Sequence, residues 1–218
     1  MTLVSAIMPT RGRVLWAHEA VECFRNQTYA EKELVILDDA DEPSFEGDAF
    51  VYEDGVQYFR LTQRCTIARK RNDAVRLAAG SVILHWDSDD WSSPYRMADQ
   101  LTRLERTSKR VTGYHSVLFY DEHSQRAYRY HGRPNVAVGS SLCYAKSFWQ
   151  DHPFNERRTI EEDNEFVLTA AAAGELITVD GAGLIVARIH AGNTAAKPVD
   201  RPEYRPVEIL EIPRGFPR

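Results

Sequence analysis

Three carboxylates stand within four residues at Asp87-Ser88-Asp89-Asp90, directly after an apolar run. Their mutual repulsion is costly unless a cation or hydrogen-bond donors compensate for it. Oxygen ligands in a loop suit Mg²⁺ or Mn²⁺, and Mg²⁺ is usually held by one or two carboxylates while substrate phosphates complete its shell. The cluster therefore indicates a divalent metal and a phosphate-bearing substrate, and the alternative is a solvated acidic turn.

Arg71 is predicted to face the interior of the protein. It shares a helix face with four apolar residues, which are Ile67, Ala74, Val75 and Ala78. An arginine on such a face needs an anion. Two partners stay open, a substrate phosphate or a carboxylate such as Asp87, and both place Arg71 beside the acidic cluster.

Asp163 is the candidate catalytic base. Apolar residues follow it at helical spacing, namely Phe166, Val167 and Ala170, so its carboxylate should lie on the buried edge of a helix. An aspartate held there could accept the proton of an attacking hydroxyl. The run Thr159 to Glu162 resembles a capping box, so Glu161 and Glu162 are expected to be ordinary partners of the helix dipole.

His190 ends the last apolar run and precedes the loop sequence Ala191-Gly192-Asn193. Its imidazole could supply a nitrogen ligand to the same metal. A lone histidine is more often structural, so both interpretations stay open. The remaining histidines show no metal-ligand spacing with one another.

The elements that must position these residues alternate along the first half of the chain. The periodicity predicts strands and helices in the order β-α-β-β-α-β over residues 3–8, 14–26, 33–37, 56–61, 66–79 and 81–86. Such alternation predicts an α/β fold with a mainly parallel sheet, which binds ligands at the carboxyl ends of its strands. Asp38-Asp39 and the acidic cluster both follow strands.

The second half is richer in strands and is predicted to form the acceptor side of the same fold. Strands are expected at residues 111–120, 126–131, 140–144, 176–179 and 184–189, with a helix at 162–173. Five prolines follow Lys197. They favour an extended tail that lies on the surface or is partly disordered.

Composition narrows the class of protein. A chain of 218 residues with 43% hydrophobic and 27% charged residues suits one folded domain. Its net charge of −5 gives no basic footprint for nucleic acid. Three cysteines without ligand spacing predict neither a disulfide framework nor a zinc site, and no apolar run approaches the roughly 18 residues of a membrane span, so a cytoplasmic location is expected.

A succession of motifs resembles the family 2 glycosyltransferases over about residues 3–193. The matching segments, in the order that family shows, are Val4 to Arg13, Asn26 to Tyr29, Leu34 to Asp39, Ala68 to Asn72, Ala79-Gly80, and Asp87 to Trp91 as the metal-binding DxD motif. The resemblance implies a single GT-A (Rossmann-like) domain over 1–196, with a nucleotide-sugar-binding half at 1–92 and an acceptor and base half at 93–196. Residues 197–218 would form the tail.

The resemblance also implies roles for individual residues. The implied donor-binding residues are Pro9, Thr10, Arg11, Asp39, Arg71, Asp87 and Ser88. Asp89 would ligate the metal, and His190 falls where many members place a further metal or diphosphate ligand. Glu162-Asp163 resembles the late Glu-Asp pair whose aspartate is the base in inverting members. Ala40 and Asp41 stand where the family usually has Gly and Ser, and residues 41–54 are unusually acidic.

The implied activity is inverting transfer of a sugar from a nucleotide-diphosphate donor, with a UDP-sugar favoured and Mn²⁺ or Mg²⁺ as cofactor. The acceptor would be a hydroxyl group, with a glycan ranked first and a modified nucleic acid ranked below it. A single addition is expected because the chain ends soon after His190 without membrane helices. Two alternatives remain: a sugar-nucleotide-binding module without catalysis, and a metal-dependent nucleotidyl or phosphoryl transferase.

Overall fold

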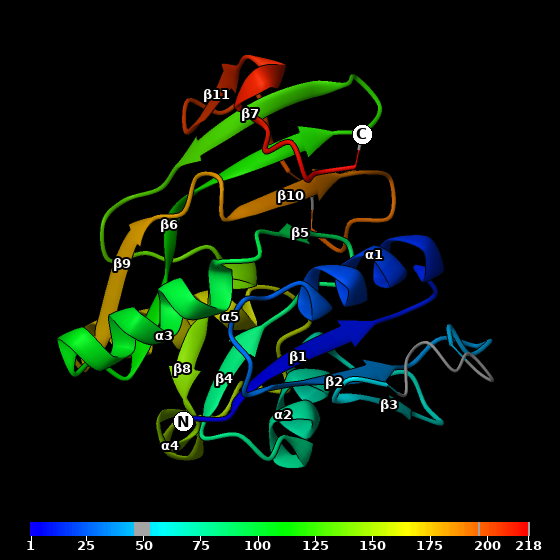
Figure 1. Cartoon of the computed structure of the whole chain (residues 1–218), viewed down its shortest axis with the longest axis vertical. Coiled ribbons are helices and arrows are strands. Elements are labelled where there is room, and N and C mark those ends of the chain that lie inside the picture. Colours follow the sequence, from blue (N-terminus) through cyan, green and yellow to red (C-terminus); the bar gives the residue numbers. More distant parts are fainter. Residues whose placement is uncertain (46–52, 196, 218) are drawn as a thin grey trace.

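A computed structural model describes residues 1–45, 53–195 and 197–217. The acidic segment 41–54 therefore lies partly outside the described residues. The elements in chain order are β1 (Val4–Thr10), α1 (Val14–Arg25), β2 (Lys32–Asp38), β3 (Val56–Arg60), α2 (Ile67–Leu77), β4 (Val82–His85), β5 (Trp91–Ser92), α3 (Arg96–Thr107), β6 (Val111–Asp121), β7 (Arg126–His131), η2 (Gly139–Ser141), β8 (Cys143–Ala145), α4 (Lys146–Asp151), α5 (Glu162–Ala172), β9 (Leu176–Asp180), β10 (Ile185–Ile189), β11 (Tyr204–Val207) and η3 (Ile209–Glu211). Figure 1 labels most of them.

The strands form one mixed sheet with the central order β11-β7-β6-β8-β4-β1-β2-β3. Strands β4, β1, β2 and β3 are all parallel, and β6 has two further parallel neighbours, β9 and β10. Beyond β4 in the sheet order, strands β8, β7 and β11 each pair with their neighbours in antiparallel fashion. The predicted α/β domain with a mainly parallel sheet flanked by helices is confirmed, and it brings the carboxyl ends of β1, β2 and β4 to one edge.

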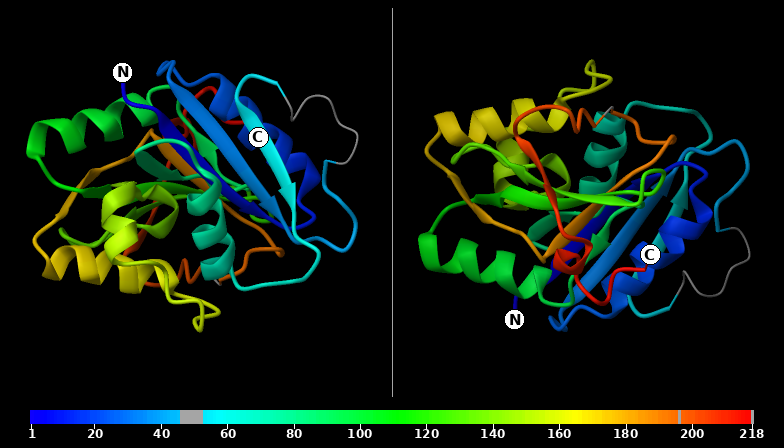
Figure 2. Two further views of the ribbon diagram at one scale, coloured as in Figure 1. Left: turned by 90° about the horizontal axis from the view of Figure 1, so that it is seen from below. Right: turned by 90° about the horizontal axis from the view of Figure 1, so that it is seen from above.

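Helices cover both faces of the sheet because its central strands are buried on both sides. On β1, Ala6 and Met8 pack with α1 and α3, whereas Ile7 packs with α2, α4 and α5. Figure 2 shows the sheet between these two helix layers. Because successive side chains of a strand point to opposite faces of the sheet, the apolar residues of β1 contribute to two hydrophobic cores, one on each face.

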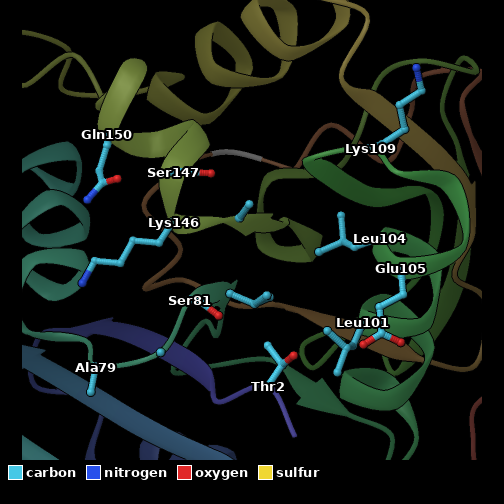
Figure 3. A pocket seen from close by; sticks show the side chains of 13 residues that line it. Thr2, Ala79, Ser81, Leu101, Leu104, Glu105, Lys109, Lys146, Ser147 and Gln150 are labelled. Carbon is cyan, nitrogen blue, oxygen red and sulfur yellow. The ribbon is translucent and has the colours of Figure 1, made fainter.

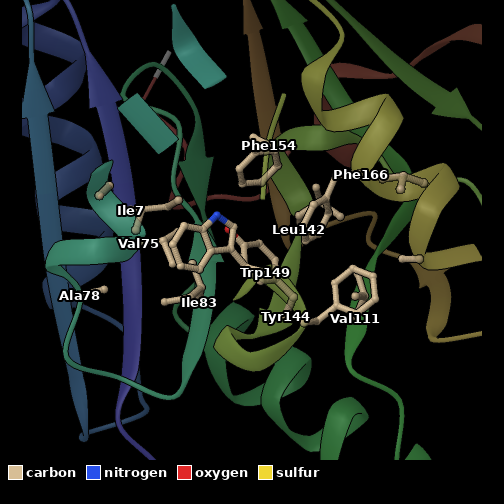
Figure 4. Close-up of a cluster of buried hydrophobic side chains, with 14 of the residues drawn as sticks. Ile7, Val75, Ala78, Ile83, Val111, Leu142, Tyr144, Trp149, Phe154 and Phe166 are labelled. Carbon is tan, nitrogen blue, oxygen red and sulfur yellow. The ribbon is translucent and has the colours of Figure 1, made fainter. Parts of the chain in front are cut away.

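The core beneath α5 is rich in aromatic rings (Figure 4). Phe166 of α5 stacks on Phe154 with ring centroids 4.7 Å apart, and it contacts Tyr144 of β8 at 4.8 Å. Such ring pairs contribute beyond the area that they bury. They fix the first turn of α5, which carries Asp163, against the sheet.

The tail expected to be extended or partly disordered is instead partly built into the fold. Strand β11 pairs with β7, and Ile212 and Phe216 are buried. Helix α5 begins at Glu162 as expected, but the predicted capping box was wrong: Glu161 has a left-handed φ of 62°, and no side chain caps the helix. Helices α3 and α4 were not expected. In the described ranges, no helix is both long enough and apolar enough to cross a bilayer.

Candidate active site

A cleft of about 1080 Å³ opens where β1 and β4 end. Its walls come from the loops after β1 and β4, the first turns of α2 and α5, the turn η2, and the segment after β10. Strands β1, β4 and β10 and helices α2 and α5 are labelled in Figure 1. Nine of the ten predicted site residues line it: Pro9, Thr10, Arg11, Asp39, Arg71, Asp87, Ser88, Asp89 and Asp163. The tenth, His190, contacts Asp89 from the loop that follows β10.

The three aspartates of the acidic cluster have different surroundings. Asp87 lies 3.5 Å from Arg71 Nη2, and its pKa is raised because burial outweighs the effect of that arginine. Asp90 accepts a hydrogen bond from the backbone N–H of Arg188 at 3.2 Å. Burial, together with repulsion from Asp89 and Asp87, raises the pKa of Asp90 to about 8. The cluster therefore carries uncompensated repulsion.

Asp89 has the strongest compensation of the three. Its Oδ2 accepts hydrogen bonds from Arg13 Nη1 at 2.7 Å, from His190 Nε2 at 3.0 Å and from Asn193 Nδ2 at 3.4 Å. Burial acts to raise the pKa of Asp89, but the His190 hydrogen bond and the Arg13 charge outweigh it, so the pKa lies below its usual value. Asp89 is thus ionised at neutral pH and available to a cation.

Of the two partners that the sequence left open for Arg71, a substrate phosphate or a carboxylate, the structure shows carboxylates. It is 3% exposed and pairs with Glu162 and, at 3.5 Å, with Asp87. Glu162 is 4% exposed, so the expectation that it is an ordinary dipole partner was wrong. The reason is tertiary, because α2 and α5 bring these two side chains together across 91 positions of sequence.

Asp163 lies beside this ion pair but is not part of it. Its side chain is half-buried and lines the cleft, and its Oδ1 accepts a hydrogen bond from the backbone N–H of Asn164 at 2.9 Å. Because Arg71 pairs with Glu162 and Asp87, the carboxylate of Asp163 stays directed to the cleft. A carboxylate that lines a cleft in this way is accessible to a ligand bound there.

Asp39 is buried at the edge of the cleft, and both of its carboxylate oxygens have partners within the protein. Its Oδ1 pairs with Lys70 Nζ at 2.7 Å, and its Oδ2 accepts the backbone N–H of Cys65 at 3.0 Å. Lys70 also donates to the carbonyl of Thr10 at 3.0 Å. This buried ion pair joins β1, β2 and α2 at the edge of the cleft.

Three buried polar atoms of the cleft lack a hydrogen-bond partner within the described part of the chain. They are Thr10 Oγ1, Ser88 Oγ and Arg71 Nε. A buried polar group without a partner costs free energy, so native proteins keep few of them. Their position at the cleft points to polar atoms of a ligand that complete these bonds.

Asp89 and His190 are the side chains that could hold a metal. One carboxylate and one imidazole, 3.0 Å apart, fit Mn²⁺ or Mg²⁺ in kind, and phosphate oxygens would complete the shell. The residues that the structure describes contain no group of three or more His, Cys, Asp or Glu side chains arranged around a metal. His190 Nδ1 accepts the backbone N–H of Gly192 at 3.1 Å, so the proton of a neutral ring lies on Nε2 and must move before Nε2 can ligate.

Sequence reasoning missed four residues at this site: Arg13, Lys70, Glu162 and Asn193. Lys70 is four residues before the buried Ala74, so helical spacing alone gave a signal for it. Arg13 and Asn193 reach Asp89 from loops 76 and 104 positions away in sequence, and no local pattern marks such contacts.

A second hollow of about 700 Å³ lies at the opposite ends of β1 and β4 (Figure 3). Its lining includes Thr2, Gly80 and Ser81, which precede those strands, together with Lys109 and Lys146. The ammonium groups of both lysines donate to backbone carbonyls, those of Gly174 and Ala78. This hollow therefore has structural contacts and none of the clustered carboxylates found in the cleft.

A family model described as Glycosyl transferase family 2 matches residues 5–174. That segment is more than half of the chain and contains nine of the ten predicted site residues, all except His190. The chain belongs to glycosyl transferase family 2. It is 31% identical over 109 residues to a Rickettsia felis (strain ATCC VR-1525 / URRWXCal2) protein named "Uncharacterized glycosyltransferase", a stretch that is 49% of this chain and 18% of that protein.

Solved structures share the fold of this family member. Residues 1–349 of S. aureus TarS in complex with UDP-GlcNAc match with a TM-score of 0.72 and 16% identity, over 88% of this chain and 60% of that one. The mannosyltransferase PcManGT from Pyrobaculum calidifontis, in complex with GDP-Man and Mn²⁺, matches with a TM-score of 0.68 and 15% identity, over 86% and 56%. The chain thus spans less than two thirds of each of these proteins.

Proposed function

We propose that this chain transfers a sugar from a nucleotide-diphosphate donor to an acceptor hydroxyl, in one addition with inversion and with the help of Mn²⁺ or Mg²⁺. The observation that carries the proposal is the single cleft that gathers Asp89, Arg71 and Asp163 with three unpartnered polar atoms. UDP-GlcNAc and GDP-Man are bound in two solved structures with the same fold. A UDP-sugar is the favoured donor, and a glycan is the favoured acceptor.

Each side chain has one task in this proposal. Asp163 accepts the proton of the acceptor hydroxyl as its oxygen attacks the anomeric carbon from the face opposite the leaving group. The bond from that carbon to the diphosphate oxygen breaks, and the electron pair leaves with the nucleoside diphosphate. Asp89 and His190 would hold the metal, which would supply positive charge to stabilise the departing diphosphate.

The remaining predicted residues bind the donor. Thr10 and Ser88 offer their unpartnered hydroxyls, and Arg71 offers its unpartnered Nε. Pro9, Arg11, Asp39 and Asp87 line the same cleft. Residues 1–196 would form the catalytic domain, with its donor half at 1–92 and its acceptor half at 93–196. The three cysteines are free thiols, which supports a cytoplasmic location.

The test is a panel of nucleotide sugars with and without Mn²⁺ or Mg²⁺, read first as a shift in melting temperature and then as transfer to an acceptor. A ligand at 100 times its Kd stabilises the folded state by about 2.7 kcal/mol. We expect Asp89→Ala to lose the metal-dependent shift, and Asp163→Asn to keep it but lose transfer. Asp151→Asn, which alters a surface ion pair with Arg110, is the matched control. An Asp163→Asn variant with normal transfer would refute the base assignment.

A further inference from the structure

The turn η2 meets the first turn of α5 at the wall of the cleft. Gly139 is buried and begins η2, and Asp163 is the second residue of α5. A Cβ added to Gly139 would overlap with Oδ2 and Cγ of Asp163 and would lie 2.8 Å from its Cβ. The carboxyl group of Asp163 therefore occupies the volume that any other side chain at position 139 would fill.

The backbone of Gly139 does not itself require glycine. Its φ lies outside the left-handed region, in contrast to Gly12, Gly55, Gly174 and Gly183. Alanine could adopt this conformation without backbone strain. The reason for glycine here is thus the space that Asp163 takes. Alanine would require the Asp163 carboxyl group to rotate away and η2 and α5 to separate slightly, because rotation does not move the Asp163 Cβ that lies 2.8 Å from the added Cβ.

Gly139 is held in place from behind by two buried side chains. His85 Nδ1 donates to the carbonyl of Gly139 at 2.8 Å, and Tyr144 donates to His85 Nε2 at 3.4 Å, which is the arrangement of a neutral ring protonated on Nδ1. Arg96 Nη2 donates to the carbonyls of Ser140 at 2.6 Å and of His85 at 2.7 Å. The wall of the cleft is therefore fixed to the end of β4.

This attachment relates the two halves of the site. His85 is the last residue of β4, and Asp87 follows two residues later. The same strand end thus carries the acidic cluster and, through His85 and Arg96, the backbone of Gly139 that Asp163 packs on. These contacts, from β4 through His85 and Arg96 to the backbone of η2, determine the position of the Asp163 carboxylate relative to the acidic cluster.

We propose that Gly139 is a positioning residue for Asp163, because its missing side chain leaves the volume in which the carboxylate is held toward the acceptor hydroxyl. The inference rests on the proposed function, in which Asp163 is the base. It assigns to position 139 an effect on the transfer step and none on donor binding. A displacement of a catalytic group by about 1 Å can lower a rate about 100-fold.

The test is Gly139→Ala, assayed for donor affinity by thermal shift and for transfer by kcat. We expect kcat to fall about 100-fold while donor affinity stays within about twofold of the native value. The same substitution in an Asp163→Ala background should change the residual rate by less than about twofold, because the base is already absent. A Gly139→Ala variant with native kcat, or an undiminished effect in the Asp163→Ala background, would overturn the proposal.

Gly80→Ala is the matched control. Its Cβ would lie 2.5 Å from the carbonyl oxygen of Leu3 and from Ser5 Oγ, at the far end of the sheet beside the second hollow. It should lower the melting temperature and leave kcat of the folded protein unchanged. If Gly139→Ala fails to fold, the double variant Gly139→Ala/Asp163→Gly lacks every overlapping side-chain atom and should melt at the same temperature as Asp163→Gly. A double variant that also fails to fold refutes the packing argument.

The outcomes separate this inference from the proposed function. A native protein that transfers no sugar in the donor panel contradicts the proposed function, whereas the melting temperatures of the double variant still test the contact between Gly139 and Asp163. A native protein that transfers sugar, together with an inactive Asp163→Asn variant and a fully active Gly139→Ala variant, contradicts only the role of Gly139.

Discussion

Replacing Arg71 by methionine removes the guanidinium that Glu162 and Asp87 share. Arg71 is 3% exposed, and it pairs with Glu162, which is 4% exposed, and with Asp87. Methionine keeps much of the stem volume, so the perturbation is mainly one of charge. In the variant, two carboxylates face each other in a poorly solvated site without their cation.

The size of the effect follows from this burial. Removing one partner of a buried ion pair costs about 3–5 kcal/mol, because the other charge is left uncompensated. At about 2–4 °C per kcal/mol for a chain of this length, the melting temperature should fall by about 6–20 °C. Arg69→Met is the matched control on the same helix. The Arg69 side chain is 61% exposed, its ion pair with Asp73 spans 3.5 Å, and such exposed pairs contribute little.

The pH dependence provides an independent check of the cause. Burial raises the pKa of Glu162 above its usual 4.5, and Arg71 opposes that rise. Without Arg71 the pKa rises further, so the folded variant binds a proton that the unfolded chain releases above about pH 4.5. The loss of stability should therefore be largest at pH 7.5 and smaller at pH 5.5. Urea denaturation at both pH values measures this loss of stability. The double variant Arg71→Met/Glu162→Gln should recover most of the free energy of unfolding that Arg71→Met loses. A loss below about 1 kcal/mol at pH 7.5, equal to that of Arg69→Met, would refute the reasoning.

Two further predictions concern stability. Burial holds the pKa of His85 well below 6.5, so the stability due to its neutral ring is present above that pH. It is lost as the pH falls, at up to about 1.4 kcal/mol per pH unit. In urea denaturation, the free energy of unfolding of His85→Asn should fall less steeply with decreasing pH than that of the native protein, and the same steepness in both would contradict this. Phe216 is 4% exposed and packs on Arg188 and Tyr120, so Phe216→Ala should cost about 3–5 kcal/mol, whereas Leu210→Ala, at an 85% exposed position, should change the free energy of unfolding by less than about 0.5 kcal/mol. If both substitutions have the same small effect, the C-terminal segment does not pack as described.

The first half of the fold followed from local patterns. Strands β1, β2 and β4 are apolar runs buried on both faces, and α1 and α2 repeat apolar residues at helical spacing, so type and approximate bounds were predictable. Arg71 and the acidic cluster were predictable for the same reason, because periodicity and strand ends decide which side chains reach the interior edge of a parallel sheet.

Features that depend on distant partners were not predictable. Strand β11 contains Pro206 and forms only because β7, about 75 residues earlier, offers its edge. Helix α3 buries Arg96 and Gln100 beside its apolar residues. Because these two residues are polar, the buried face of the helix does not show a continuous apolar pattern in the sequence. Glu162 was interpreted as an ordinary partner of the helix dipole because its own helix gives no reason for burial, and Arg71 supplies that reason from another helix.

The pairing of charges around the cleft explains why a cation is expected to enter with the donor. Arg13 pairs with Asp89, Lys70 with Asp39, and Arg71 with Glu162 and Asp87. A diphosphate can gain from these three cations only by weakening pairs that already exist, and each separation leaves a poorly solvated carboxylate behind. A divalent ion on Asp89 avoids that cost because it adds positive charge to the site. Donor binding without metal should therefore be weak in the native protein. Asp89→Ala frees only Arg13, so it should recover metal-free binding in small part, because Arg71 and Lys70 keep their own partners.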